Sequence, residues 1–132
     1  MRFMEVRRMT SYETASELLA DGQSAVALFP RGHNFAIGEN GEGTTGVWAL
    51  DGERARKVGW IVIYLQDERG GGALWRARNG GLEAGDRPGK KRGRGWNVKL
   101  VDLELMGHTD KAWWQFAGGM LKSQKEIRYV QR

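Results

Sequence analysis

Six basic side chains lie close together in the sequence between residues 76 and 94. Two of them fall in an apolar stretch, and four lie among glycines in residues 80–95. Cations in such a row can contact the phosphates of a nucleic acid and release counterions as they bind. We therefore predict a phosphate-binding surface here, and a solvated loop without a partner is the alternative. The six residues are Arg76, Arg78, Lys90, Lys91, Arg92 and Arg94.

Aromatic side chains are the second group that could take part in binding. The chain contains six tryptophans, among them the adjacent Trp113 and Trp114, which point different ways on a helix. An exposed indole beside a basic groove offers a platform on which a base can stack. We expect most of the tryptophans to pack in the core. Together with Phe116, the adjacent pair could instead form an exposed apolar patch, which would suit a protein–protein adaptor.

The two histidines, His33 and His108, suggest an enzyme as an alternative. Each stands next to a glycine, and two histidines can act as general acid and base on RNA without a metal. No motif fixes the geometry of either one, so we favour a protein that is not an enzyme. The sequence also lacks cysteine and any metal-ligand spacing of histidines, and we predict neither a metal nor another cofactor.

The apolar run of residues 58–66 is the element around which these groups must be placed. Its β-branched and aromatic residues favour a strand. Alternation sends the even-numbered residues from Trp60 to Tyr64 to one face and the odd-numbered residues from Ile61 to Leu65 to the other. Both faces are apolar, so both must be covered, and we predict a central strand.

Short apolar runs separated by turns predict a single α+β domain over residues 1–132. We expect a curved or closed, mostly antiparallel sheet of five to seven strands with two short helices. Glycine-rich residues 38–46 and 80–95 are expected to be loops, the second one flexible. The predicted helices cover residues 10–22 and 111–117, and the predicted strands cover residues 23–29, 33–37, 47–50, 58–66, 73–78, 96–105 and 126–130.

The charge is distributed unevenly along the 132 residues. Residues 1–52 carry four basic and seven acidic side chains, whereas residues 53–132 carry seventeen basic and nine acidic ones. A basic surface of this kind attracts polyanions, so we predict nucleic acid as the partner. No apolar run approaches the roughly 20 residues that span a bilayer. We expect a cytoplasmic protein, monomeric and without a membrane partner.

Three features of the chain resemble the PUA-like superfamily, which includes the EVE, ASCH and YTH types. They are Gly46-Val47-Trp48 at the end of a glycine-rich loop, the apolar strand at residues 60–65, and the long strand at residues 96–105 followed by a helix. The resemblance covers residues 25–116. It implies a small barrel that binds RNA or DNA, and several members of the superfamily hold a flipped, often modified base in an aromatic pocket.

On this resemblance, Trp48 and Trp60 would be walls of a base pocket and Asn34 would read the edge of the base. The basic hairpin of residues 76–94 would then position the nucleic acid through its phosphates. The prediction is thus a binding module for single-stranded or modified nucleic acid.

Overall fold

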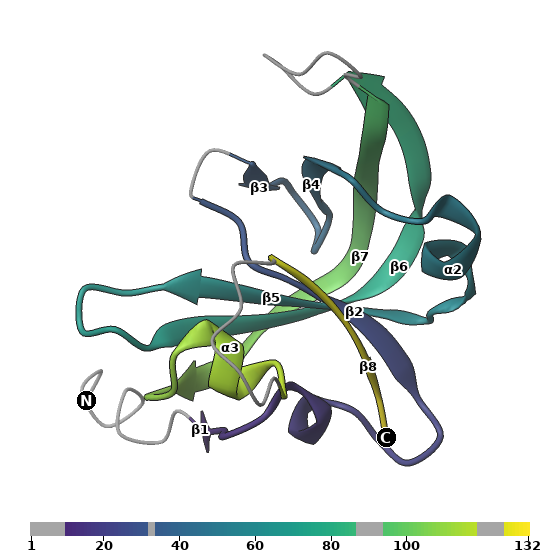
Figure 1. Cartoon of the computed structure of the whole chain (residues 1–132). Helices are drawn as coiled ribbons and strands as arrows, with labels where there is room; N and C mark the ends of the chain where they lie inside the picture. The colour runs from purple at the N-terminus through teal and green to yellow at the C-terminus, as the bar shows by residue number, and fades with distance from the viewer. Residues whose placement is uncertain (1–9, 32–33, 87–93, 119–125) are drawn as a thin grey trace.

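The computed structural model describes residues 10–31, 34–86, 94–118 and 126–132. This part of the chain forms one sheet of eight strands with two short α-helices and one turn of 3₁₀ helix, η1 (Figure 1). The elements are β1 (Thr10–Ser11), η1 (Ala15–Leu18), β2 (Ser24–Leu28), β3 (Phe35–Ile37), β4 (Gly43–Trp48), α2 (Gly52–Lys57), β5 (Trp60–Gln66), β6 (Gly72–Asp86), β7 (Arg94–Thr109), α3 (Trp113–Phe116) and β8 (Ile127–Gln131).

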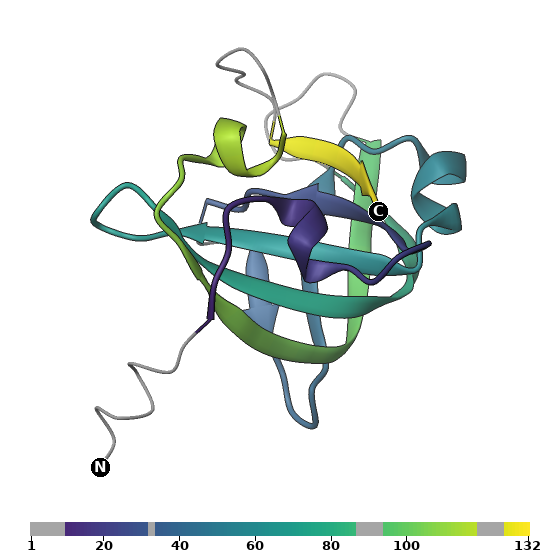
Figure 2. The ribbon, with the colours of Figure 1, turned by 90° about the horizontal axis from the view of Figure 1, so that it is seen from below.

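The sheet is strongly curved and mostly antiparallel, as predicted (Figure 2). Its hydrogen-bonded order is β3-β4-β7-β6-β5-β2-β8, and β1 pairs with the far end of β7. Only the β2–β5 and β1–β7 pairs are parallel. Within the described chain, β3 and β8 stand at the two ends of this order and do not pair with each other, so the sheet is open and closure into a barrel is not confirmed.

Strand β5 lies inside the sheet with both faces buried, which confirms the prediction for this run. Val62 and Tyr64 belong to one core cluster, with Trp60 packed against it. Ile61 and Ile63 belong to a second cluster on the opposite face. The alternation of side chains along one strand therefore divides the core into two halves, one on each face of the sheet.

Helix α3 covers the first of these clusters with aromatic side chains. The ring of Tyr64 lies 5.7 Å from Trp113 and 5.4 Å from Phe116, and Phe29 packs edge-on against it at 5.3 Å. Trp113 and Phe116 are buried and Trp114 is half-buried. The expectation that these three residues form an exposed patch is therefore wrong, because a helix this short is held in place by the side chains it buries.

Two segments differ from the elements predicted for them. In place of a helix over residues 10–22, Thr10–Ser11 pairs with β7, and only Ala15–Leu18 is helical. The capping carboxylate is that of Glu17, which accepts hydrogen bonds from the backbone N–H groups of Glu13 and Thr14. These bonds lower the pKa of Glu17, because they stabilise its charged form.

The second difference concerns residues 80–95, which we expected to be a loop. Strand β6 instead continues through Asn79-Gly80 to Asp86, and β7 begins at Arg94. Register shifts mark bulges near Asn79, and a further bulge in β7 places Asp102 at φ 53°. This second bulge lets Leu103 pack against the same cluster as Val98 and Leu100, whereas Val101 and Leu105 remain exposed. The expected flexibility concerns mainly residues 87–93, which lie outside the described chain.

Tyr64 leads to a first prediction, on stability at alkaline pH. Its hydroxyl donates a hydrogen bond to the carbonyl of Lys111 at 2.7 Å, and burial, aided by Asp67, raises the pKa of Tyr64 to about 12. In the unfolded chain a tyrosine ionises near pH 10. The contribution of Tyr64 to the free energy of unfolding is therefore complete below pH 10. We expect roughly 2 kcal/mol of this free energy to be lost as the pH rises to 12.

Urea denaturation of wild type and Tyr64→Phe from pH 8 to pH 12 measures this effect. The variant lacks the hydrogen bond to the Lys111 carbonyl, so it should be less stable than wild type by about 1 kcal/mol at pH 8. Its stability should decline less than that of wild type at high pH. Tyr129→Phe serves as the control and should keep the alkaline decline that Tyr64 causes. Parallel curves for wild type and Tyr64→Phe would contradict the prediction.

Candidate nucleic-acid interface

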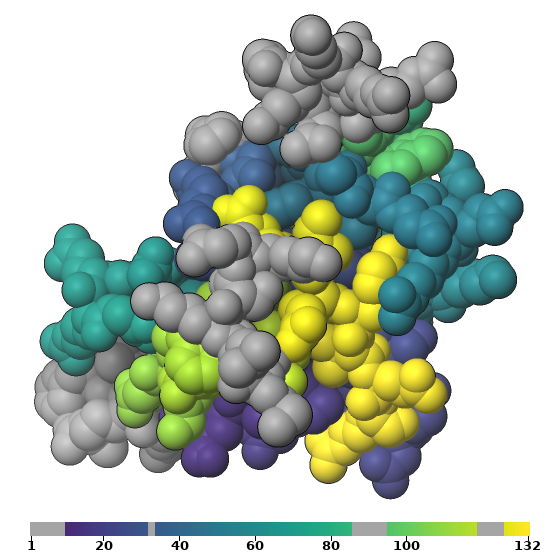
Figure 3. All heavy atoms as spheres, in the orientation of Figure 1, coloured from purple at the N-terminus to yellow at the C-terminus, as the bar shows by residue number. Residues whose placement is uncertain are grey.

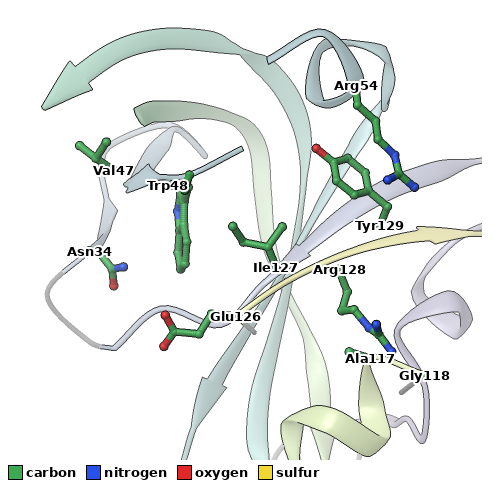
Figure 4. Close-up of a pocket in the computed structure, with 11 residues that line it drawn as sticks. Asn34, Val47, Trp48, Arg54, Ala117, Gly118, Glu126, Ile127, Arg128 and Tyr129 are labelled. Atoms are coloured by element: carbon green, nitrogen blue, oxygen red, sulfur yellow. The ribbon is translucent and has the colours of Figure 1, made fainter. Parts of the chain in front are cut away.

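A pocket of about 840 Å³ lies between β4 and β8, where the open sheet leaves a gap (Figure 4). Its walls come from distant parts of the sequence: the end of β4, the start of β8, helix α2 and the residues after α3. A volume of this size lies within the range of small-molecule and cofactor sites. The lining residues are Asn34, Val47, Trp48, Ala49, Arg54, Ala117, Gly118, Glu126, Ile127, Arg128 and Tyr129.

Trp48 and Asn34 form one wall and are joined through Thr45. The indole Nε1 of Trp48 donates to the Thr45 hydroxyl at 3.0 Å, and this hydroxyl donates to the backbone carbonyl of Asn34 at 2.5 Å. The Oδ1 atom of Asn34 accepts the backbone N–H of Arg31 at 2.8 Å. Among the residues that the structure describes, no partner is recorded for the Nδ2 group of Asn34, so this side chain retains donors for a ligand.

The opposite wall is an aromatic ring covered by a guanidinium group. Arg54 lies over the ring of Tyr129 at 3.9 Å, and the Tyr129 hydroxyl approaches the Asp51 carbonyl at 3.5 Å. Burial raises the pKa of Tyr129, an effect that the positive charge of Arg54 opposes. Ile127 lies between this ring and Trp48, so the pocket has apolar sides and a polar rim (Figure 4).

The charged residues among those described that line the pocket are Arg54, Arg128 and Glu126. Glu126 is bound to Arg31, so the carboxylate at the rim is neutralised. Arg54 and Arg128 have no carboxylate within ion-pair distance in the described chain. An unneutralised guanidinium at the mouth of a pocket favours an anionic ligand.

Helix α2, which carries Arg54, was missed in the sequence, where residues 53–57 look like a charged connector. Its start is capped by Asp51, whose carboxylate accepts the N–H groups of Glu53 and Arg54. At its other end, the side chain of Asn79 donates to two carbonyls, those of Ala55 and Val58, at 2.9 Å each. The cap is visible in the sequence as Asp51 two residues before Glu53, whereas the contact with Asn79 is not.

The predicted base-pocket residues are only partly brought together. Asn34 and Trp48 meet in the pocket, but Trp60 packs against the cluster on the other face of the sheet. There its ring lies 4.7 Å from the guanidinium of Arg76 and 4.8 Å from that of Arg78. Trp60 therefore cannot be a wall of the same pocket.

The two arginines on β6 also have acidic partners, which we did not expect. Arg76 pairs with Glu104 at 3.2 Å and donates to the Leu18 carbonyl, and Arg78 pairs with Asp102 at 3.2 Å. Paired side chains on a strand are less available to a phosphate than free ones. Arg94 begins β7, and Lys90, Lys91 and Arg92 lie outside the described residues, so their role stays a prediction.

The outer half of the β6–β7 hairpin lies beside the pocket. Trp48 pairs with Trp96 across β4 and β7. A Cβ atom added at Gly85 would lie 3.1 Å from the side chain of Val47, a lining residue of the pocket. Strand β6 ends at Asp86, one residue after this position.

His108 lies near the C-terminal end of β7, whereas the pocket lies near the start of this strand. It pairs with Ala73 and Ser11, near the end of a strand whose opposite half, around Trp96, borders the pocket. His33 is outside the described chain, but its neighbour Asn34 lies at the pocket. A catalytic site shared by the two histidines therefore stays an untested alternative.

No cluster of His, Asp and Glu suitable for a metal ion occurs among the described residues. None of the helices in this described part of the chain has the length and apolar character needed to span a bilayer. Comparison with protein-family models, curated proteins and solved structures finds no match.

Proposed function

We propose that this protein binds single-stranded nucleic acid, RNA or DNA, with one base in the pocket between β4 and β8. The observation that carries the proposal is one pocket that contains Trp48, Tyr129 and the amide group of Asn34. At its rim lie two arginines that have no carboxylate partner among the described residues. Aromatic walls accept the faces of any base, and an amide can read one edge of it.

The charge distribution supports nucleic acid over a neutral ligand. Arg54 and Arg128 flank the pocket, and the hairpin beside it leads to Lys90, Lys91 and Arg92. Arg54 and Arg128 would thus be available to the phosphates of a strand whose base occupies the pocket. A modified base remains part of the proposal, because a volume of 840 Å³ leaves room for substituents on the ring.

The resemblance to PUA-like domains remains a proposal of the same kind. In its favour, a curved sheet places Trp48 and Asn34 at one pocket. The assignment of Trp60 as a wall of the base pocket is wrong, because Trp60 lies on the other face of the sheet. Tyr129 lines the pocket instead. The proposal therefore rests on the pocket itself and uses the resemblance only as support.

Filling the pocket tests this function. Ala49 lines the pocket and is exposed, so Ala49→Trp should place an indole in the binding space without disturbing the core. We expect the affinity for a mixed-sequence RNA octamer to fall roughly five- to hundredfold, which corresponds to the loss of about 1–3 kcal/mol of base stacking. Fluorescence anisotropy of the labelled octamer measures the change.

Ala20→Trp is the matched control, because it adds the same side chain at an exposed alanine that does not line the pocket. It should bind as wild type does. Equal affinity of Ala49→Trp and Ala20→Trp would refute the pocket as the binding site. Electrophoresis of the RNA after incubation tests the enzymatic alternative: intact RNA supports a binding module, and shortened products would favour cleavage with His33 and His108.

A further inference from the structure

A second, smaller hollow of about 210 Å³ lies between α2 and β8, and these two elements adjoin on the surface (Figure 3). It shares Arg54 and Tyr129 with the large pocket, so the stacked pair of these residues stands between the two. Lys57 borders only the small hollow, whereas Trp48, Asn34 and Arg128 border only the large one. The two spaces are thus neighbours separated by one cation–aromatic pair.

The small hollow combines cations with hydrogen-bond donors. Its lining contains Lys57, Arg54, Ser24 and Gln131, and no Asp or Glu among the residues that the structure describes. Like Arg54, Lys57 has no ion-pair partner among the described residues. The carboxylate of Asp51 caps α2 through the N–H groups of Glu53 and Arg54.

The stack with Tyr129 holds Arg54 between the two spaces. A guanidinium that lies flat on a ring keeps its N–H groups at the edge of the plane, where they can donate to an oxygen. One arginine can therefore contact a phosphate that joins a base in the large pocket to the next nucleotide. Lys57, on the far side of the stack, can contact the same group as a point charge.

We infer that the small hollow is a phosphate subsite, which binds the phosphate next to the nucleotide whose base occupies the large pocket. This inference rests on the proposed function and deepens it, since it requires a strand of nucleic acid and not a free base. The strand would run along β8 and under α2, past Tyr129. A solvated helix with no phosphate contact is the alternative.

Lys57→Gln tests the subsite, because it removes a charge from the small hollow and changes no residue of the large pocket. Each phosphate contact with a single strand contributes about 0.7 to the slope of log affinity against log salt. We expect Lys57→Gln to reduce the magnitude of the slope for the RNA octamer by about 0.7. By the same relation, the affinity at 0.1 M salt should fall about fivefold.

Lys99→Gln is the matched control, because Lys99 is an exposed lysine that pairs with Glu83 and lines neither space. It should leave the slope unchanged, and thermal unfolding should show that both variants are folded. If Lys57→Gln and Lys99→Gln give equal slopes while Ala49→Trp still weakens binding, the phosphate subsite is overturned and the base pocket stands. If Ala49→Trp also binds as wild type does, the proposed function fails as well.

Discussion

Replacing Lys90, Lys91, Arg92 and Arg94 together by alanine is expected to weaken binding of a mixed-sequence RNA octamer about a hundredfold at 0.1 M salt. If three of these four side chains contact phosphates, each contributes about 0.7 to the log–log slope, and the total is about 2. The slope should flatten by the same amount. Affinity should fall alike for all sequences, because phosphate contacts carry no base information.

Titrations at four or more salt concentrations measure both quantities at once. Arg78→Ala is the control, since Arg78 projects from the same hairpin but pairs with Asp102. We expect a change in slope well below 0.7 for this variant, because its charge is already neutralised. A quadruple variant with the wild-type slope would show that the hairpin is a solvated surface. The site would then rest on Arg54, Lys57 and Arg128 alone.

The structure shows which substitution can distinguish the contribution of base stacking to affinity from that of charge. Trp48 and Trp60 were the expected stacking residues, but Trp48 is only 4 % exposed and Trp60 lies on the other face of the sheet. Trp48→Ala would create a cavity in the core, so a loss of binding could not be assigned to stacking. Ala49→Trp avoids this problem, because Ala49 is exposed, and it should lower affinity with little change in slope.

The features that the sequence predicted correctly are those set by neighbouring residues. The alternation along β5 assigns its side chains to two faces, and the structure has them there. A cap at Thr109 or Asp110 and a stop at Gly118 predict a short helix over residues 111–117, and the structure has Trp113–Phe116 helical. Local periodicity determines such elements because a strand repeats every two residues and a helix every 3.6.

The features that were missed depend on contacts between distant segments. Glycines in residues 80–95 suggested a loop, yet pairing with β7 holds residues 80–86 in a long strand with bulges. Cross-strand hydrogen bonds and packing outweigh the poor strand preference of glycine there. The pocket likewise joins Trp48 of β4 to Tyr129 of β8, which no spacing in the sequence relates.

Phe116→Ala is expected to destabilise the protein by about 3–5 kcal/mol, the cost of emptying a fully buried phenylalanine site. Its side chain has no exposed surface and packs on Tyr64 with ring centres 5.4 Å apart. Helix α3 spans only four residues, too few to be stable in isolation, so Trp113 and Phe116 must hold it on the sheet. The loss of Phe116 should therefore also weaken the contact of Tyr64 with the Lys111 carbonyl.

Urea denaturation gives the change in the free energy of unfolding. Gln115→Ala is the control, because Gln115 is exposed in the same helix, and its expected effect is below about 0.5 kcal/mol. If Phe116→Ala does not fold, Phe116→Leu still tests the site, with an expected loss of roughly 1 kcal/mol from the imperfect fit. An exposed adaptor surface predicts the opposite pattern: wild-type stability for both Phe116 variants. That result would contradict the packing of α3 on the sheet.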